Sequence, residues 1–369
     1  MKRLLILGDA NSAHIHKWAL SLSLKGIEVG VFTLTEPPAN WPENHFHIQI
    51  FSSLNIATDQ IKSNAFLKVN YLKSLRLLKK VIKQFKPDIV HAHYATSYGL
   101  LARLSRFRPY IISAWGSDVM DFPGKSIIHK SILKRNLKSA AVVMATSETI
   151  SAAIKNVIDS EVEIVPFGID LNVFKRKEIT RIFDASYIVI GTIKSLEKIY
   201  GIDILINAFH ILKTKYKSIK LLIVGTGSQE LAYKSLVKQL NLDNDVVFTG
   251  KIDYEKITDY HNMIDIFVNV SRNESFGVSV IEASACEKPV IVSNVGGLPN
   301  VVVNSKTGFI VNTEDPSDTA RAIDLLMNDS SLRFKMGEEG RQFVKNKFEL
   351  NKNTDDLIGI YERILKLQH

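Results

Sequence analysis

The 369-residue chain has almost no cysteine and no long apolar run. A single cysteine, Cys286, excludes a disulfide framework and a cysteine-rich metal site, and it suits a reducing compartment such as the cytosol. The apolar run after Met1 stops at Asp9, which is too short for the core of a signal peptide, so we expect a buried first strand. No stretch reaches the roughly 18 uncharged apolar residues of a spanning helix, so we expect a soluble or peripheral protein.

A dinucleotide-binding fingerprint is also absent. The stretch LLIVGTGSQE supplies Gly225 and Gly227, but Glu230 stands where the third glycine of GxGxxG belongs. We therefore expect a tight strand-to-helix turn whose backbone can line a ligand site, and no nicotinamide cofactor.

Acidic residues are scarce in the first half of the chain. Residues 1–170 contain 21 Lys and Arg against 13 Asp and Glu, whereas residues 171–369 contain 26 against 25. Segment 66–86 contains seven basic residues, no acidic residue and apolar positions at helical spacing. Two interpretations stay open for it: a core-facing helix with a solvated basic back, or docking on an anionic membrane surface. Nucleic acid is not an expected partner, because no helix-turn-helix, RNA-stacking or zinc motif is present.

Short β-branched runs alternate with amphipathic stretches along the chain. Runs such as RLLIL, DIVHAH, YIVIG and PVIVS predict strands, and the alternation predicts α/β architecture with parallel sheets covered by helices. The pattern pauses between Pro166 and Ser186. We therefore expect two doubly wound, Rossmann-like domains, 1–170 and 171–345, facing a central cleft, with a helical segment, 346–369, packing back toward the first domain.

The motif ESFGVSVIE places two carboxylates, Glu274 and Glu282, around a Phe-Gly turn. It follows a predicted strand and opens an apolar helix, whose first amides belong to Gly277, Val278 and Ser279. Such amides carry partial positive charge and bind anions, and a glycine lets a phosphate approach the backbone. A carboxylate beside a phosphate needs hydroxyl partners, which a ribose and a hexose supply. The motif thus predicts a nucleotide sugar as ligand.

These residues resemble the signature of the retaining glycosyltransferases with two Rossmann-like domains, called family 4, which have the GT-B architecture. The resemblance extends over nearly the whole chain. Its most specific motifs are GTIKSLEKIYGID, IVGTGS, VVFTGKI, ESFGVSVIEASACEKPVIVSNVGGLPNVV and TGFIV. Looser matches in the first half are GDANSAHIHKWALSL, DIVHAHYATSYG, SAWGSD and PFGID.

The resemblance implies an activity and a separate role for each domain. A hexose moves from a nucleotide sugar, UDP-linked more readily than GDP-linked, to a lipid-linked or growing glycan in the synthesis of a bacterial surface polysaccharide such as capsule or lipopolysaccharide. The first domain binds the acceptor and the second binds the donor. No cofactor is implied, and we expect the protein in the cytoplasm or on the inner face of the membrane.

The resemblance also assigns roles to residues of the donor site. Glu274 contacts the donor hexose, Glu282 holds the ribose, and the amides after Phe276 bind the phosphates. The family usually places an Arg and a Lys on the loop after the first strand of the second domain. Here Lys194 and Lys198 take that role. Further positions expected at the donor are Gly191, Gly225, Gly250 and Lys251.

A metal is not expected. Breaking the anomeric bond leaves charge on a diphosphate, which positioned ammonium groups and helix amides can stabilise. Asp243 to Asp245 match the DxD motif of metal-dependent transferases, but they lie in a turn before the strand VVF, away from the predicted helix end. Two-carboxylate glycoside hydrolysis needs an acid and a nucleophile about 5 Å apart across one bond, whereas here a phosphate site lies between the glutamates.

The first domain contains four candidate acceptor-side residues. Trp115 stands where the family often has the His of a His-Gly pair, and it either stacks on a sugar or is a partly buried aromatic residue. Asp118 either faces the acceptor or caps a helix. His14 and His93 either line the acceptor site, one of them taking the acceptor proton, or are ordinary hydrogen-bonded histidines.

Two other functions stay open. A UDP-N-acetylglucosamine 2-epimerase shares this architecture, and a non-catalytic nucleotide-sugar-binding module is also compatible with the motifs. Incubation with UDP-N-acetylglucosamine alone separates the three: an epimerase makes a new sugar, a transferase hydrolyses slowly, and a binding module does neither.

Overall fold

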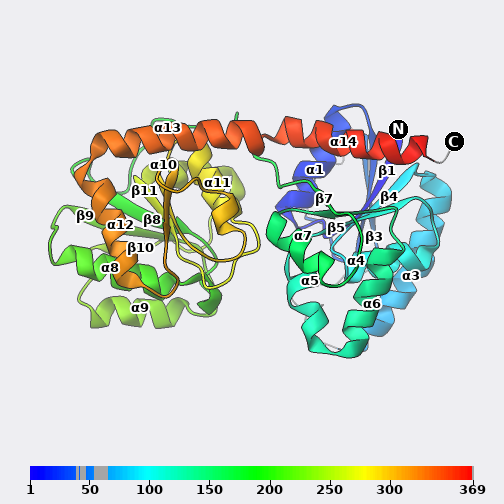
Figure 1. The fold of residues 1–369 in the computed structure, drawn as a ribbon, viewed down its shortest axis with the longest axis horizontal. Coiled ribbons are helices and arrows are strands. Elements are labelled where there is room, and N and C mark those ends of the chain that lie inside the picture. Colours follow the sequence, from blue (N-terminus) through cyan, green and yellow to red (C-terminus); the bar gives the residue numbers. More distant parts are fainter. Residues whose placement is uncertain (39–40, 42–46, 54–64, 368–369) are drawn as a thin grey trace. The chain divides into compact units, whose positions relative to one another are not determined.

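The computed structural model describes residues 1–38, 41, 47–53 and 65–367 (Figure 1). The chain forms two compact units. Unit 1 consists of Met1–Phe167 and Leu350–His369, and unit 2 consists of Gly168–Glu349. The last helix therefore belongs to the unit that contains the amino terminus.

Unit 1 is built on a parallel sheet of seven strands in the order β3-β2-β1-β4-β5-β6-β7. The strands are β1 (Arg3–Leu7), β2 (Glu28–Thr33), β3 (Ile48–Ser52), β4 (Ile89–His93), β5 (Tyr110–Ala114), β6 (Val142–Ala145) and β7 (Glu163–Ile164). Strand order reverses between β1 and β4, and such a reversal opens a crevice at the carboxyl ends of the two strands.

Helices cover both faces of this sheet (Figure 1). They are α1 (Ala13–Leu24), α3 (Ala65–Phe85), α4 (Ser97–Ser105), α5 (Ser117–Met120), α6 (Ile127–Lys138), α7 (Glu148–Lys155) and α14 (Leu350–Lys366), with a 3₁₀ turn, η1 (Phe122–Lys125). Leu22 of α1 and Tyr361 of α14 share one buried cluster, whereas Leu78 of α3, Leu101 of α4 and Leu133 of α6 share another.

Unit 2 repeats the design with a parallel sheet of six strands in the order β10-β9-β8-β11-β12-β13. The strands are β8 (Ile188–Ile193), β9 (Ile219–Val224), β10 (Val246–Phe248), β11 (Ile266–Asn269), β12 (Val290–Ser293) and β13 (Gly308–Val311). The helices are α8 (Ile202–Lys213), α9 (Glu230–Gln239), α10 (Ile257–Met263), α11 (Val278–Ala285), α12 (Pro316–Asn328) and α13 (Ser330–Lys347), with 3₁₀ turns η2 (Lys198–Tyr200), η3 (Tyr254–Lys256) and η4 (Leu298–Asn300). The predicted fold class, two doubly wound Rossmann-like domains, is confirmed.

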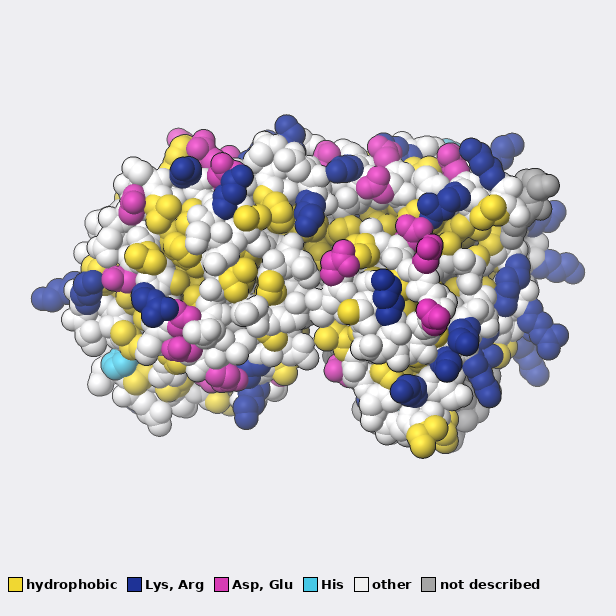
Figure 2. All heavy atoms as spheres, viewed as in Figure 1, with side chains coloured by type: hydrophobic (Ala, Val, Ile, Leu, Met, Phe, Trp, Pro, Cys, Tyr) yellow, Lys and Arg dark blue, Asp and Glu magenta, His cyan; other side chains and the backbone are white. Residues whose placement is uncertain are grey.

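The basic segment of unit 1 forms α3, and its last three turns show both a buried and a charged side. Leu78, Val81 and Phe85 are buried against the sheet. The exposed side chains in these turns include Lys73, Arg76, Lys79, Lys80 and Lys83. Dark blue side chains accordingly gather at the edge of the molecule where α3 lies (Figure 2). Helix α3 therefore faces the core with its apolar side, as in the first of the two interpretations. Docking of its basic side on a membrane stays a prediction. Within the described ranges, none of the helices has the length and apolar character required to cross a bilayer.

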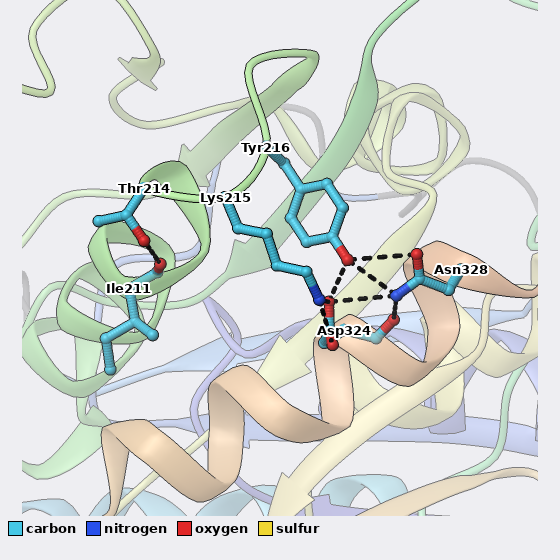
Figure 3. Close-up of polar contacts among 6 residues, drawn as sticks. All are labelled: Ile211, Thr214, Lys215, Tyr216, Asp324 and Asn328. Carbon is cyan, nitrogen blue, oxygen red and sulfur yellow. Dashed lines mark hydrogen bonds and ion pairs between the residues drawn. The ribbon is translucent and has the colours of Figure 1, made fainter.

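Polar side chains tie α12 to the amino edge of the unit 2 sheet (Figure 3). Lys215 and Tyr216 precede β9, and both bind the carboxylate of Asp324 on α12, with 3.1 Å between the lysine Nζ and Oδ1. Asn328 donates from Nδ2 to the Tyr216 hydroxyl at 2.8 Å. This edge is thus occupied by structural contacts, and the opposite edge remains for a ligand.

Candidate active site

The carboxyl ends of β8 and β11 bring the predicted donor residues together. These neighbouring strands are where the strand order of unit 2 reverses, so their ends form the crevice in which doubly wound sheets bind ligands. Lys194 follows β8 directly, and Glu274 lies on the loop after β11. The two residues are 80 positions apart in sequence, and only the strand order makes them neighbours.

Lys194 and Glu274 form an ion pair in which the lysine Nζ donates to Glu274 Oε2. Their side chains are only 15% and 10% exposed. The lysine Nζ also lies 4.3 Å from the centroid of the Tyr200 ring. Burial and the charge of Glu274 raise the pKa of Tyr200, which keeps its phenol protonated. An ammonium group, a carboxylate and a phenol therefore meet at the switch point, where they can contact phosphate oxygens and sugar hydroxyls.

Glycines after β9 hold the loop that begins at Lys194. Gly225 has a φ of +134°, and a Cβ there would lie 2.0 Å from the Lys194 carbonyl oxygen. A Cβ on Gly227 would lie 2.4 Å from the Leu196 carbonyl oxygen. The amide of Lys194 donates to the Val224 carbonyl at 2.9 Å. The predicted tight turn thus has a specific purpose, because only glycine permits this backbone contact with the lysine loop.

A second pair of glycines supports Glu274 from the other side. The amide of Gly297 donates to the Glu274 carbonyl at 2.8 Å. Gly296 has a φ of +53°, and a Cβ there would lie 1.9 Å from the same carbonyl oxygen. In the sequence VGGLP is only part of a longer motif, whereas the structure shows that its glycines position Glu274.

The helix start after Phe276 has the geometry of an anion site. Gly277 precedes α11 with a φ of +98°, a left-handed conformation that favours glycine. The amides of Gly277, Val278 and Ser279 belong to the start of the helix, which has no intrahelical acceptor for them. The Phe276 ring is buried and lies edge-on to Phe348, with 5.6 Å between centroids. Phe276 therefore anchors the helix start by its side chain.

Glu282 lies on the second turn of α11 and is 6% exposed. The Nε2 atom of His261, on α10, is 3.5 Å from Glu282 Oε2, and the His261 ring is fully buried. Burial, with the charges of Glu282 and Asp170, raises the pKa of Tyr254. No sequence pattern indicated His261, because it lies on a separate helix and its spacing from Glu282 matches no motif.

Arg272 is a second residue that the sequence did not indicate. Its guanidinium donates to both carboxylate oxygens of Asp203, at 2.8 and 2.7 Å, and to Glu314. Nη1 also donates to the Lys198 carbonyl at 2.7 Å, and the Arg272 amide donates to the Ile199 carbonyl at 2.7 Å. Hydrogen bonds to Asp203 are the main reason that the pKa of Arg272 is raised. Arg272 thus fixes the η2 turn, which presents the exposed Lys198.

Other predicted donor positions have different surroundings. Gly191 lies inside β8, and a Cβ there would lie 2.7 Å from Ile264 Cγ1, so this glycine serves packing in the sheet. Because β8 continues to Ile193, the lysine loop begins only after this strand, and a donor contact by Gly191 stays a prediction. The Gly250 carbonyl accepts the Gly225 amide at 3.0 Å, and Lys251 beside it is exposed.

The DxD match lies at the amino edge of the sheet, before β10. One oxygen of Asp245 is 3.0 Å from the Lys213 ammonium and 2.9 Å from the Lys220 ammonium. This carboxylate is therefore held in structural ion pairs at the edge opposite to Lys194. In the part of the chain that is described, no three His, Cys, Asp or Glu residues are grouped in a way that could hold a metal ion.

Three of the acceptor-side candidates in unit 1 form an aromatic cluster. The half-buried His14 ring stacks on the Phe167 ring with 3.8 Å between centroids. It lies edge-on to the Trp115 ring with 5.6 Å between centroids. His93 is buried at the end of β4, 5.4 Å from Trp115. Burial, with the neighbouring charges of His91 and His14, lowers the pKa of His93 far below its usual value. His93 is therefore a neutral ring that borders a small internal cavity.

Asp118 has a structural explanation. The residue is fully buried, and its carboxylate accepts hydrogen bonds from the amides of Ala95 at 2.6 Å, Gly116 at 2.9 Å and Trp115 at 3.1 Å. Burial raises the pKa of this carboxyl although the three amides act in the opposite direction. Asp118 is not the N-cap of α5, which is Gly116; its carboxylate instead holds the backbone before this helix and shapes the loop that carries Trp115.

Two solved structures share the whole fold. A sucrose-phosphate synthase from Thermosynechococcus elongatus has a TM-score of 0.86 and 20% identity, with all of both chains covered. HepE from Anabaena, solved with UDP-glucose, has a TM-score of 0.77 and 19% identity, with 97% of this chain and 100% of that chain covered. These likenesses show that the chain has the GT-B fold, with two Rossmann-like domains.

Sequence comparisons identify the family. Residues 3–147 match the family model "Glycosyl transferase 4-like", and residues 175–343 match "Glycosyl transferases group 1". An N-acetyl-alpha-D-glucosaminyl L-malate synthase from Bacillus anthracis is 26% identical over 78% of both chains. The capsular polysaccharide biosynthesis glycosyltransferase CapM from Staphylococcus aureus is 38% identical over 48% of this chain and 47% of its own. The chain belongs to the group 1 glycosyltransferases with a family-4-like amino-terminal domain, as the motifs predicted.

Proposed function

We propose that this protein is a retaining, metal-independent hexosyltransferase that uses a UDP-sugar in the synthesis of a bacterial surface polysaccharide. The observation that carries the proposal is the Lys194–Glu274 pair at the switch point of unit 2, on the edge where α11 begins. The bound UDP-glucose of the HepE structure and the name of CapM support the donor and the pathway type.

The donor is held by groups that match its chemistry. Glu282 accepts hydrogen bonds from the ribose hydroxyls, and the first amides of α11 bind phosphate oxygens. Lys194 leaves its pairing with Glu274 to contact the diphosphate, and Lys198 adds a second cation. Glu274 then accepts hydrogen bonds from the hexose. These opposite charges select a ligand that is anionic at one end and rich in hydroxyls at the other.

The reaction breaks the bond between the anomeric carbon and the diphosphate oxygen. The electron pair stays on the diphosphate, where the two ammonium groups and the helix amides stabilise it. An acceptor hydroxyl bonds to the anomeric carbon on the face that the diphosphate leaves, so the configuration is retained. The hydroxyl proton passes to the departing phosphate oxygen.

We assign acceptor binding to unit 1, with His14 and Trp115 as the aromatic contacts. His93 stays neutral because burial lowers its pKa, so it serves as a hydrogen-bonding group. We further propose that the acceptor is a lipid-linked glycan and that the exposed basic side chains of α3 attract the enzyme to anionic lipid. The enzyme would then act on the cytoplasmic side of the membrane.

The test begins with a panel of UDP, GDP and ADP sugars in thermal-shift measurements, because a ligand that binds only the folded state raises the melting temperature. We expect UDP-sugars to give the largest shift. The preferred donor is then incubated without acceptor, where slow hydrolysis supports a transferase and formation of a second nucleotide sugar indicates an epimerase. Absence of any shift with the whole panel would contradict the donor assignment.

A further inference from the structure

Three helices of unit 1 that pack side by side, α3, α4 and α6, contain no acidic residue. Helix α4 contacts both α3 and α6, so the three helices form one layer over the sheet. Their sequences contain eleven Lys and Arg and no Asp or Glu. The sequence showed this bias only for α3. The fold adds α6, whose basic residues Lys130, Lys134, Arg135 and Lys138 are exposed.

An apolar tip lies at the amino end of α6. Ile127 and Ile128 are 87% and 70% exposed at the first two positions of the helix. Lys125 and Lys130 flank them and are exposed as well. The tip contains yellow side chains at the lower end of unit 1, with dark blue side chains above them (Figure 2).

Local contacts fix the tip in this outward arrangement. The Ser126 Oγ atom accepts the His129 amide at 3.3 Å and caps the helix. The His129 ring lies edge-on to Phe122 of η1, with 4.7 Å between centroids. These contacts hold the start of α6, and among the described residues Ile127 and Ile128 are two of the most exposed large apolar side chains. Adjacent exposed apolar side chains bordered by lysines are a candidate contact surface.

We propose that Ile127 and Ile128 insert into the acyl region of an anionic bilayer and that the basic layer of α3, α4 and α6 lies over its headgroups. Apolar side chains beside lysines are the combination that membrane-surface segments present, because the two types contact different depths of the bilayer. A nucleic acid would match the basic layer but offers nothing to two isoleucines. A second copy of the chain would need about 1,200 Å² of buried surface, more than two side chains supply.

The inference rests on the proposed function, since the bilayer would contain the lipid-linked acceptor, and it adds an insertion site to the electrostatic attraction of α3. The two contributions are separable by salt. At molar salt the screening length falls to about 3 Å, so binding through lysines is lost while binding through buried isoleucines persists.

The first test measures sedimentation with phosphatidylglycerol–phosphatidylcholine vesicles at low salt and at about 1 M salt. We expect the double variant Ile127→Ser and Ile128→Ser to bind at least tenfold more weakly at both salt concentrations, since burying one such side chain is worth about a factor of ten or more. The matched control is Leu231→Ser, on α9 of unit 2, where the leucine is 79% exposed. Equal binding of the double variant and the wild type would overturn the proposal.

The second test measures depth with a polarity-sensitive maleimide dye on Ile127→Cys. Labelling is selective because the native Cys286 is buried and burial raises the pKa of its thiol to about 12. We expect vesicles to shift the emission to the blue for this label and not for the same label on Leu231→Cys. Three outcomes would each reject insertion. The emission could stay unshifted, the wild type could form a dimer that disappears in the serine double variant, or the protein could bind single-stranded RNA without binding vesicles. Donor affinity of the serine double variant, measured by calorimetry, reports separately on the donor site and should equal that of the wild type.

Discussion

At the residue scale, each carboxylate of the predicted site has a different partner. Glu274 is neutralised by Lys194, whereas Glu282 lies beside the buried ring of His261. Under the proposed assignment, the donor separates Lys194 from Glu274, and Glu282 accepts the ribose hydroxyls. This difference gives the two glutamates distinct expected phenotypes.

Replacement of Glu282 by Ala should weaken UDP binding by about 1.5 to 3 kcal/mol, the range for losing hydrogen bonds to a charged group. Because UDP contains no hexose, and because Lys194 without its Glu274 partner is free for the diphosphate, replacement of Glu274 by Ala should not weaken UDP binding and should lower turnover instead. Calorimetry with UDP checks both variants. The control Glu255→Ala removes an exposed carboxylate of η3 and should behave as the wild type. Undiminished UDP affinity of the Glu282 variant would refute the ribose assignment.

Replacement of Lys198 by Ala should lower turnover by about 100-fold, the scale for losing one positioned group that stabilises a developing charge. Steady-state kinetics measure this, with Lys238→Ala on α9 as a control for removing an exposed lysine. If the Lys198 variant keeps wild-type turnover, another group stabilises the diphosphate.

At the scale of elements, the turn η2 depends on a neighbouring loop. Arg272 binds the Lys198 carbonyl from the end of β11, and its guanidinium is held by Asp203 and Glu314. The arginine is therefore a positioning residue for the lysine turn. Its charge is already matched by two carboxylates, which makes it a poor candidate for binding the diphosphate itself.

Replacement of Arg272 by Gln should release η2, lower turnover by at least tenfold and speed amide hydrogen exchange in residues 194–200. The control Arg181→Gln breaks an ion pair with Asp265 before β11, at the opposite edge of the sheet. The Arg181 variant should have a lower free energy of unfolding, with unchanged amide hydrogen exchange in the lysine loop. Unaltered exchange in the Arg272 variant would show that η2 is held by other contacts.

At the scale of the whole molecule, α14 returns to unit 1 and completes its buried histidine network. The hydroxyl of Tyr361 is 2.7 Å from His91 Nδ1, and the Ser113 hydroxyl is 2.8 Å from His91 Nε2. Burial lowers the pKa of His91 to about 3. Unit 1 is therefore folded with an uncharged histidine that the unfolded chain would protonate near pH 6.5.

The stability of unit 1 should fall as pH decreases from about 6.5 toward 3, because the unfolded state then binds protons that the folded state excludes. Each such histidine contributes at most about 1.4 kcal/mol per pH unit in this window. Scanning calorimetry between pH 7.5 and 4.5, with His91→Asn as the comparison, measures the effect. At pH 7.5 the variant should be less stable than the wild type, and its stability should decrease less as the pH falls. Identical pH profiles would exclude His91 as the source.

The sequence by itself determined the fold class and the donor motif. Short apolar runs that alternate with amphipathic stretches specify parallel strands, because helices cover both faces of such a sheet, and a Phe-Gly turn before an apolar helix predicts an anion site, because helix amides are unpaired there. These signals are local, so Glu274, Glu282 and the start of α11 could be identified without coordinates. The same locality explains why the packing of Gly191 was not foreseen, since it depends on Ile264 in another segment.

Only the tertiary structure decided which distant residues meet. Strand order, not sequence spacing, sets the distance between side chains at the ends of β8 and β11, and it places Lys194 against Glu274. Arg272 reaches the turn of Lys198 across 74 positions for the same reason. The basic layer of unit 1 likewise required the packing of α4 between α3 and α6, because a surface belongs to helices that are adjacent in space and not to one stretch of chain.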